Sequence, residues 1–540
     1  MTSKLSSSSV GVIGETEAKL SNTQSLQITC RVAVRPNRFT FCIPLQSPVC
    51  RVGYTPNVRK GTDMTLFFIA LVIAILAALS LGLGGLATVE YKIVTHHGQT
   101  TQLVQVVQSG IDAASKAIDD PGHPDLIDNP QYFCSIEVIP AILNSPGFGA
   151  GRFTIFSPRY EQDQVQGVRF GLTRESAKLS LESILAWENE SAGRGVRALQ
   201  KLPGITPTVV DSILDWLDAD DNARSQGAEA DYYRQQQKSY TPRNAVPVAL
   251  EELLLIRNVE RTMIFGDDLQ LSFGATQSVL RTKSATPDDL GDPFSPLSIW
   301  DEAAPSRRRG RSSTNNASAW QFFLTPYSAE KIVNAQGVVR IFLNESNLEF
   351  LESQLRLHQL DAESIGFILS WRNVNGNIGD PLDLLDAEIT VDEFTTLASP
   401  FSCSDPAMFE RFLRLLDEAV TDSAIVVRGR INVNEAPRQV LEAVPELTPE
   451  IVTAMLERRK PGAETQRHTV WLLAEGIVDT DTMKTLSRRL TTGGDVYRIQ
   501  VAGFFDNLPR LHRVEAVLDA TVKPPRTVFY KDLTPLGISE

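Results

Sequence analysis

The sequence predicts an α+β protein in which a long N-terminal helix precedes an antiparallel sheet, and the sheet is interrupted by a large helical insertion. Three observations lead to this prediction. A run of 26 residues without a charge, Met64–Val89, stands near the N-terminus. Segments that alternate apolar and polar residues occur near both ends of the remaining chain. Between them, a pattern typical of helix–turn–helix units is repeated three times.

Composition and charge are those of a globular protein with an acidic bulk. The chain has 540 residues, of which 42% are hydrophobic and 22% charged, and a formal charge of −13. This composition excludes a disordered chain and a protein with several membrane spans. Residues 1–60 hold eight basic and two acidic residues, a charge of +6, so residues 61–540 carry −19. Because binding to nucleic acid or anionic lipid depends on Lys and Arg, we expect no nucleic-acid partner.

The uncharged run is long enough to cross a membrane, since a helix of about 20 apolar residues spans the hydrocarbon core. Arg59 and Lys60 precede it, and the positive-inside rule places them in the cytoplasm. One alternative is a buried core helix, which normally has a polar stripe. The other is a cleaved signal peptide, whose apolar region is shorter. Apolar residues continue at helical spacing to Ile118, so residues 62–120 are expected to form one transmembrane and amphipathic helix.

A basic pair and a glycine, Arg59-Lys60-Gly61, directly precede the apolar run. This arrangement resembles the processing site of type IV prepilins, where the peptidase cuts after the glycine and the apolar helix is retained. The resemblance implies cleavage between Gly61 and Thr62, with residues 1–61 as a basic leader. That leader is unusually long, so translation could start downstream of Met1. The fifth mature residue would be Leu66, where pilins carry a glutamate that pairs with the subunit ahead; a subunit without it needs no neighbour ahead.

Strands are expected at both ends of the outer region. Residues 121–175 contain two short strands within 150–172, separated by a Ser-Pro break. Residues 491–540 supply three more, at 496–504, 510–521 and 527–530. Cys134 and Cys403 are the two cysteines after the proposed leader, and their spacing leaves open whether they pair.

The helical middle contains a repeated unit that reads as helix, tight turn, helix. One copy falls in each of the regions 176–275, 276–425 and 426–490. The second helices begin with a capping residue, which is Thr206, Asp361 or Thr448. The paired segments are Lys178–Leu185 with Leu202–Trp216, Arg340–Leu351 with Leu360–Arg372, and Arg430–Leu441 with Leu447–Arg459.

Similar helix pairs occur in helix-hairpin-helix DNA-binding proteins, so a membrane-anchored DNA-binding or DNA-uptake protein is the alternative function. Such proteins use a glycine-containing turn whose backbone N–H groups bind a phosphate. The turn at 202–205 has Gly204, but the corresponding turns of the other two copies lack glycine. Because the chain is also acidic, a scaffold is favoured over a DNA-binding role.

An acidic cluster follows the first copy. Aspartates at alternating positions, followed by a glycine and further carboxylates, suit a hard cation with oxygen ligands such as Ca²⁺. The spacing is not that of the twelve-residue EF-hand loop, and a solvated acidic loop is the alternative. The candidate ligands are Asp218, Asp220, Asp221, Glu229 and Asp231.

Together these features resemble one family, the general secretion pathway protein K of type II secretion systems, which is a large minor pseudopilin. The resemblance rests on the prepilin-like start, the interrupted sheet, and the segments Leu214–Asp221, Gly227–Tyr233 and Ile431–Ala436. It covers roughly residues 60–265 and 425–530. The region 276–425, with the basic loop Arg307–Arg311, is not typical and indicates a divergent member.

The resemblance implies a pseudopilin-type sheet and a structural role at the tip of a short periplasmic pseudopilus. There the protein would start pseudopilus assembly and support export across the outer membrane. It further implies calcium in the helical domain, and one inner-membrane span with a cytoplasmic N-terminus and a periplasmic bulk. The implied partners are other minor pseudopilins, the major pseudopilin and the prepilin peptidase. No HExxH, GxSxG or P-loop motif points to an enzyme.

Overall fold

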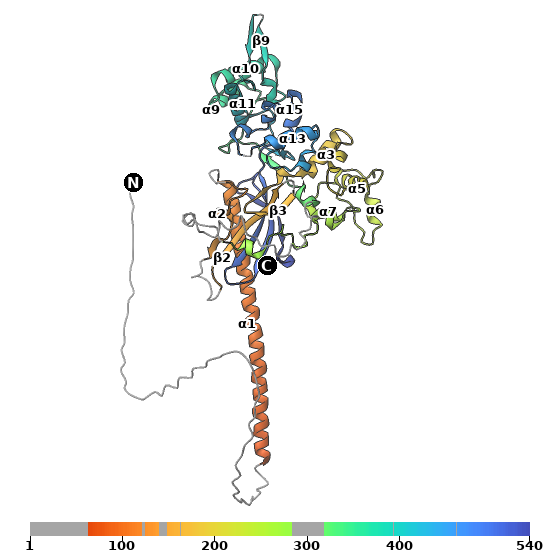
Figure 1. The fold of residues 1–540 in the computed structure, drawn as a ribbon, viewed down its shortest axis with the longest axis vertical. Coiled ribbons are helices and arrows are strands. Elements are labelled where there is room, and N and C mark those ends of the chain that lie inside the picture. The colour runs from red at the N-terminus through yellow and green to blue at the C-terminus, as the bar shows by residue number, and fades with distance from the viewer. Residues whose placement is uncertain are drawn as a thin grey trace, which may run out of the picture. The chain divides into compact units, whose positions relative to one another are not determined.

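The computed structural model describes residues 63–120, 125–139, 148–161, 164–282, 318–392, 394–460 and 462–539. The leader 1–61, Thr62 and the basic loop Arg307–Arg311 lie outside them. The chain divides into two compact units, Met1–Gly84 and Gly85–Glu540 (Figure 1).

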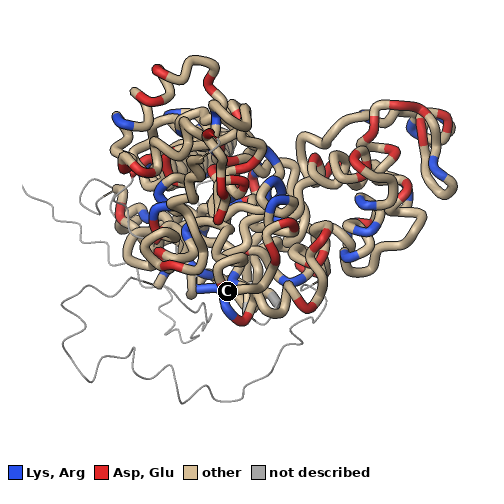
Figure 2. Tube along the Cα trace, turned by 90° about the horizontal axis from the view of Figure 1, so that it is seen from above, with Lys and Arg blue, Asp and Glu red and all other residues tan. Residues whose placement is uncertain are grey.

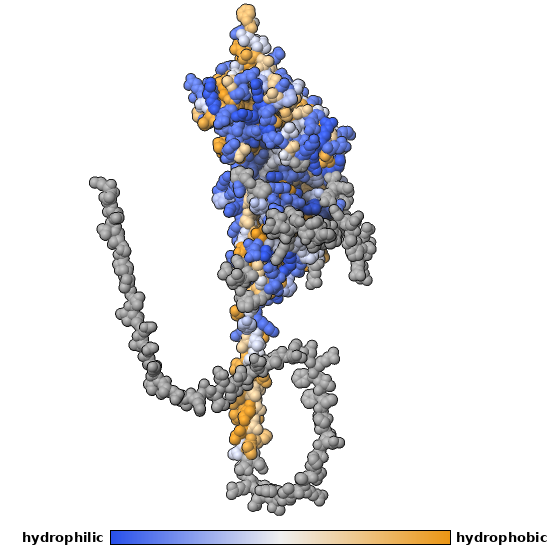
Figure 3. Space-filling model, turned by 60° about the vertical axis from the view of Figure 1, so that its left-hand side comes forward, coloured by the Kyte–Doolittle hydropathy of each residue, from blue (hydrophilic) through white to orange (hydrophobic). Residues whose placement is uncertain are grey.

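Helix α1 runs from Asp63 to Asp119, which confirms the long N-terminal helix. Its side chains from Met64 to Val89 are all exposed, and they form the orange column in Figure 3. By length and composition, α1 is the one helix of the described residues that is long and apolar enough to cross a membrane. An apolar surface on every side of a helix is stable in lipid or in a protein assembly, not in water.

The C-terminal half of α1 packs against the sheet through one stripe of buried side chains. Leu103, Val107, Ile111 and Ala114 recur at helical spacing and have at most 4% of their surface exposed. Val107, Ile111 and Ala114 belong to one apolar cluster with the inward-facing residues of strands β2, β15 and β16. The amphipathic part predicted from the sequence is therefore the part that holds the helix to the sheet.

Seven strands form the main sheet, in the order β1-β2-β15-β16-β17, with β3 beside β2 and β4 beside β15. All pairs within it are antiparallel, and residues 151–156 of β2 pair with residues 500–505 of β15. The prediction that both ends of the outer region build one sheet is thus confirmed. The strands are β1 Ile136–Ile139, β2 Gly151–Glu161, β3 Gln164–Arg169, β4 Thr173–Arg174, β15 Val496–Phe505, β16 Leu511–Asp519 and β17 Arg526–Asp532.

The expected Ser-Pro break within the first two strands was wrong, because β2 continues through Ser157 and Pro158 to Glu161. Its pairing with β15 ends at Phe156, so Pro158 lies where β2 has only β3 beside it. The register with β3 shifts between Pro158 and Tyr160. A proline lacks the N–H that a central strand must donate, and an edge position with a bulge tolerates it.

Two features of the helical insertion agree with the sequence. The second helices of the three copies begin where expected: the side chains of Thr206, Asp361 and Thr448 accept hydrogen bonds from backbone N–H groups of the first turn. The helices also fall where the repeats were read. They are α3 Leu181–Glu190, α5 Pro207–Leu217, α9 Leu348–Leu357, α10 Ala362–Asn375, α12 Arg438–Leu441 and α13 Pro449–Arg458. Two further helices, α4 Arg194–Leu199 and α6 Ala230–Arg234, lie outside the predicted segments.

The repeats contain more than helix pairs. In each copy a two-residue strand precedes the first helix and pairs in parallel with a two-residue strand that follows later in the chain. Each copy is therefore a closed unit, and the first has an additional helix, α4, between its two predicted helices. The parallel pairs are β5 Leu179–Ser180 with β6 Leu324–Thr325, β8 Ile341–Phe342 with β11 Ala419–Val420, and β13 Ile431–Asn432 with β14 Leu490–Thr491.

Further short elements complete the insertion, including a hairpin of β9 and β10 that projects at the top of Figure 1. Cys134 and Cys403, whose pairing the sequence left open, are both free. The remaining elements are α2 Pro130–Phe133, α7 Arg261–Phe265, α8 Gln277–Leu280, β7 Ala329–Lys331, β9 Glu388–Asp392, β10 Thr395–Ala398, α11 Pro406–Glu418, β12 Val426–Arg428, α14 Trp471–Ala474 and α15 Thr480–Ser487.

Two glycines set the close approach between α1 and the sheet. A Cβ added at Gly110 would lie 2.6 Å from Val501 Cγ1, and one added at Gly503 would lie 2.8 Å from Val107 Cγ2. Nearer the N-terminus of the same helix, a Cβ added at Gly98 would have no atom within 4 Å.

We therefore expect Gly110→Ala to lower the melting temperature of the full chain in detergent micelles, because overpacking a filled interface costs about 1–3 kcal/mol. Gly98→Ala is the matched control. It makes the same change in open space and should leave the melting temperature unchanged or slightly raised, since alanine favours a helix. Equal effects of the two substitutions would contradict the packing of α1 on the sheet.

Candidate functional site

The acidic cluster lies in the loop between α5 and α6. Helix α5 buries its apolar face, and its Trp216 ring meets the Tyr233 ring of α6 edge to face at 5.3 Å. These two buried aromatic side chains fix the two ends of the loop relative to each other. Figure 2 shows acidic residues gathered along the lobe that carries α5 and α6.

Asp215 is fully buried on α5 and organises the start of the loop. It accepts a hydrogen bond from the backbone N–H of Arg224 at 3.2 Å, and the Arg224 Nε lies 3.5 Å from its other oxygen. A side chain at Gly227 would overlap the Asp215 carboxylate, so the loop requires glycine there. Burial raises the pKa of Asp215 to about 6.

Glu229 is the most conspicuous group of the cluster because it is buried without a partner. Only 5% of its surface is exposed, and neither carboxylate oxygen has a hydrogen-bond partner among the described residues. Asp218 Oδ1 is unpartnered there as well. Burial, followed by the negative charges of nearby aspartates, raises the pKa of Glu229 to about 7. A buried carboxylate in this position is costly unless a cation or a proton neutralises it.

The structure brings four of the five candidate ligands into one neighbourhood. Asp218, Asp220 and Asp221 all lie close enough to Glu229 to raise its pKa. Asp231 lies outside this group, since its side chain is 93% exposed and pairs with Arg234 at 3.3 Å. Among the residues that the structure describes, no group of three or more His, Cys, Asp or Glu side chains is already arranged around a metal position.

The donor set of this cluster nevertheless fits calcium. Its groups are carboxylates, which are hard oxygen ligands, and three of their oxygens are buried and unpartnered. Asp215 was not among the candidates that spacing predicted. The signal that could have found it is its place on the apolar face of α5, where a charged residue requires a partner.

Backbone groups of the turn at 202–205, on which the DNA-binding alternative depends, already form hydrogen bonds within the protein. The carbonyl of Pro203 accepts a hydrogen bond from the Trp320 indole at 2.9 Å, and the N–H of Ile205 donates to the carbonyl of Leu202. A phosphate would need backbone N–H groups that are free to bind it. No observation in the described residues favours DNA binding.

A buried ion-pair network joins the insertion to the sheet. Glu175 has no exposed surface and accepts hydrogen bonds from Arg498 of β15 at 2.8 Å, from Lys178 at 3.0 Å and from the Thr325 hydroxyl. Arg498 also pairs with Glu515 of β16 at 2.7 Å. Burial alone would raise the pKa of Glu175, but Arg498 and Lys178 hold it at about 2.

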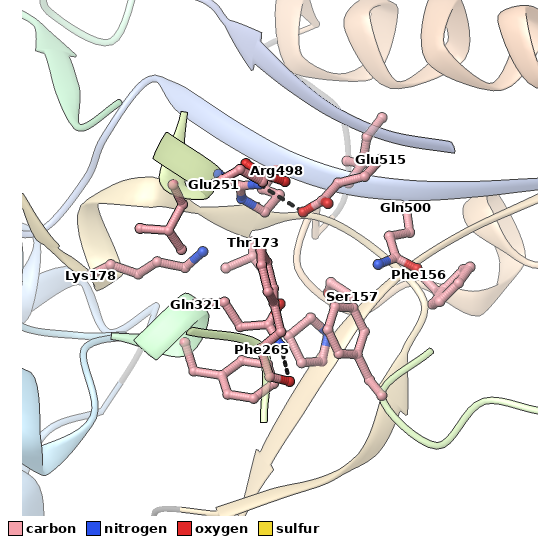
Figure 4. A pocket seen from close by; sticks show the side chains of 15 residues that line it. Phe156, Ser157, Thr173, Lys178, Glu251, Phe265, Gln321, Arg498, Gln500 and Glu515 are labelled. Atoms are coloured by element: carbon pink, nitrogen blue, oxygen red, sulfur yellow. Dashed lines mark hydrogen bonds and ion pairs between the residues drawn. The ribbon is translucent and has the colours of Figure 1, made fainter. Parts of the chain in front are cut away.

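Figure 4 shows Lys178, Arg498 and Glu515 around a small cavity of about 30 Å³ at this junction. Arg174 extends the network by pairing with Glu435 of the third repeat. The charges of the network are thus contributed by segments that lie hundreds of residues apart in the chain.

An apolar helix packed on an antiparallel sheet with a helical insertion is the architecture expected of a large pseudopilin. Residues 177–264, which contain α3 to α6 and the acidic loop, match the family described as type II secretion system (T2SS), protein K. This segment of the helical insertion is therefore similar to the protein K family of type II secretion systems.

Comparison with solved structures and curated proteins adds little to this assignment. The chain is similar to a chain in the crystal structure of the GspK-GspI-GspJ complex from the enterotoxigenic Escherichia coli Type 2 Secretion System. The identity is 10% and the TM-score 0.35, over 81% of this chain and 98% of that chain, which is too distant to carry an argument. No curated protein matches the chain.

We expect Glu175→Gln to destabilise the full chain by about 3–5 kcal/mol, because the buried Lys178 loses its carboxylate and Arg498 keeps only Glu515. Glu352→Gln is the control: it breaks an exposed pair with Arg356, and such pairs contribute at most about 1 kcal/mol. Thermal unfolding in detergent micelles compares the two variants.

The stabilisation due to Glu175 should also depend on pH. Its pKa is depressed from 4.5 to about 2 in the folded chain, so the stabilisation is complete above pH 4.5 and is lost as the pH falls toward 2. The difference in melting temperature between the wild type and Glu175→Gln should shrink over that interval. A constant difference would contradict the ion-pair network.

Proposed function

We propose that this protein is the minor pseudopilin at the tip of a type II secretion pseudopilus, where it starts assembly and supports export across the outer membrane. Its role is structural rather than catalytic. The prepilin peptidase cleaves between Gly61 and Thr62. The retained helix anchors the chain in the inner membrane, with a cytoplasmic N-terminus and a periplasmic bulk. Its partners are the other minor pseudopilins and the major pseudopilin.

The position of the insertion on the sheet supports the tip location. Along α1, Leu103 and Val107 lie against Gly503, and Gly110 lies farther along, against Val501. The helix therefore advances along β15 toward Tyr497.

The insertion leaves the sheet after β4 and returns at the start of β15, where Arg174 and Tyr497 are paired opposite each other. Both connections thus emerge at the end of the sheet toward which α1 runs. A helical domain at that end of the sheet adds bulk where a further subunit would have to stack. Leu66 at the fifth mature position agrees with this, because it provides no carboxylate for a subunit ahead.

The tip location predicts where the protein is found on isolated filaments. Pseudopili lengthened by overproduction of the major pseudopilin should bind gold-labelled antibodies against residues 181–234 at one end only. Antibodies against the major pseudopilin serve as the control and should label the whole length. If the antibodies against residues 181–234 also label the whole length, the tip location is contradicted. The protein would then be a subunit along the filament.

We further propose that the loop between α5 and α6 binds Ca²⁺. Glu229 and Asp218 would hold the ion with their unpartnered oxygens, and Asp220 and Asp221 would add negative charge beside it. Asp215 positions the loop through its contacts with Arg224. When bound, the ion neutralises carboxylates that otherwise repel one another, and so ties the loop to the start of α6.

Calcium should accordingly raise the melting temperature of the full chain, and EDTA should lower it. Glu229→Gln should abolish this response. Without calcium, the variant should be at least as stable as the wild type, because an uncompensated buried charge is gone. Asp231→Asn, a neighbouring change on an exposed side chain, should keep the full response. Loss of the response in both variants, or no response in the wild type, would contradict the assignment.

A further inference from the structure

A polar cleft lies between the second and third repeats. It has a volume of about 780 Å³ and is lined by residues of β8 and β11 on one side and of α15 and β14 on the other. A second hollow of about 420 Å³ lies between α3 and α15, and Arg488 lines both. Clefts of about 300–1,000 Å³ are the size at which proteins bind ligands.

Positive charge gathers around this cleft although the chain outside its leader is acidic. Arginines line both hollows, and the carboxylates that accompany them are already engaged. Asp380 accepts hydrogen bonds from the Leu382 N–H and the Ser487 hydroxyl. Asp422 accepts from the Ala424 N–H. The basic residues of the two hollows are Arg340, Arg428, Arg430, Arg467, Lys484, Arg488 and Arg489.

Four of these cations have acidic partners within the protein. Arg467 pairs with Glu410 and Asp417 at 2.8 and 3.1 Å. The others are also paired: Lys484 with Asp383 at 2.8 Å, Arg489 with Glu190 at 2.7 Å, and Arg430 with Glu330 at 3.7 Å.

The ion pairs of the cations in the two hollows involve the four residues above, and none within 4.0 Å joins Arg340, Arg428 or Arg488 to a residue that the structure describes. Arg340 donates its Nε–H to the carbonyl of Val333 at 3.1 Å. Burial and the neighbouring Arg430 lower the pKa of Arg340, and the charges of Glu330, Asp417 and Glu418 oppose this shift. Arg428 and Arg488 are exposed at the hollows that they line. The cleft therefore presents Arg340 and Arg488, and the adjoining hollow presents Arg428 and shares Arg488. Each of these guanidinium groups can bind a carboxylate.

We propose that this cleft and the adjoining hollow, which share Arg488, together bind an extended acidic segment of a partner protein. The carboxylates of the segment would pair with Arg340, Arg428 and Arg488. Its apolar side chains would contact the apolar part of the lining, which includes Ile332, Leu416, Val470 and Met483. A single inorganic anion would fill only a small part of the volume, and it would leave this apolar lining uncovered. A nucleic acid is disfavoured because the surrounding chain is acidic.

Fluorescence anisotropy with the full chain in uncharged detergent micelles tests the proposal. The probe is a fluorescein-labelled hexapeptide of alternating glutamate and leucine, and a hexapeptide of alternating lysine and leucine controls for uptake by the micelle. We expect saturable binding of the acidic peptide only, weakened by salt. Inorganic phosphate at equal concentration should not displace it.

Two variants with the same change in charge locate the site. Arg488→Glu should weaken binding about tenfold or more, because it replaces a charge-assisted hydrogen bond with repulsion. Arg510→Glu, at an exposed position after β15 outside the cleft, should change it less than about twofold. Both positions are exposed, so neither variant is expected to unfold the chain.

Three results would overturn the proposal. Equal weakening by the two variants would show that the whole surface, not the cleft, attracts the peptide. Displacement by equimolar phosphate would indicate a simple anion site. The absence of saturable binding would show that the cleft has no affinity for acidic segments.

Discussion

The buried carboxylate of Glu175 is the constraint on which the arrangement of the folded region depends. It lies where the chain leaves the sheet, Arg498 lies where the chain returns, and Thr325 belongs to the strand that closes the first repeat. A buried charge is tolerated only with its partners in place. The network therefore requires the insertion and the sheet to adopt one relative arrangement, and Arg174 with Glu435 adds the third repeat to it.

This arrangement gives the chain two regions with different roles. Helix α1 and the sheet form a unit suited to lateral packing: the helix is apolar on all sides at its start and held by one face at its end. The insertion adds the acidic loop, the repeats and the cleft at the end of the sheet toward which α1 runs. Under the proposed function, the first part joins the filament, and the second closes it and meets other proteins.

Much of this fold could be predicted because its signals are local. The periodicity of α1, the alternation in the C-terminal strands and the caps at Thr206, Asp361 and Thr448 depend on residues within one or two turns of each other. The elements that could not be predicted from the sequence depend on contacts between residues far apart in the chain. The strands that close the repeats are two residues long and show no periodicity.

The same distinction applies to the site and to the junction. Spacing identified Glu229 and its neighbouring aspartates as candidates, and the structure groups them. Spacing alone could not show that Asp231 points outward or that Asp215 organises the loop from a helix. Nor could it show that Glu175 meets Arg498 across more than 300 positions, because such a pairing exists only after the sheet has formed.

The most direct test of the pseudopilin assignment is the N-terminal sequence of the protein purified from the membranes of its own host. The assignment predicts a mature chain that begins at Thr62, because the peptidase cuts after Gly61 and leaves the apolar helix attached. An uncleaved N-terminus, or one that lies beyond Val89, would contradict it. In the first case α1 would be an ordinary membrane anchor, and in the second the apolar segment Met64–Val89 would be a signal peptide that the mature protein has lost.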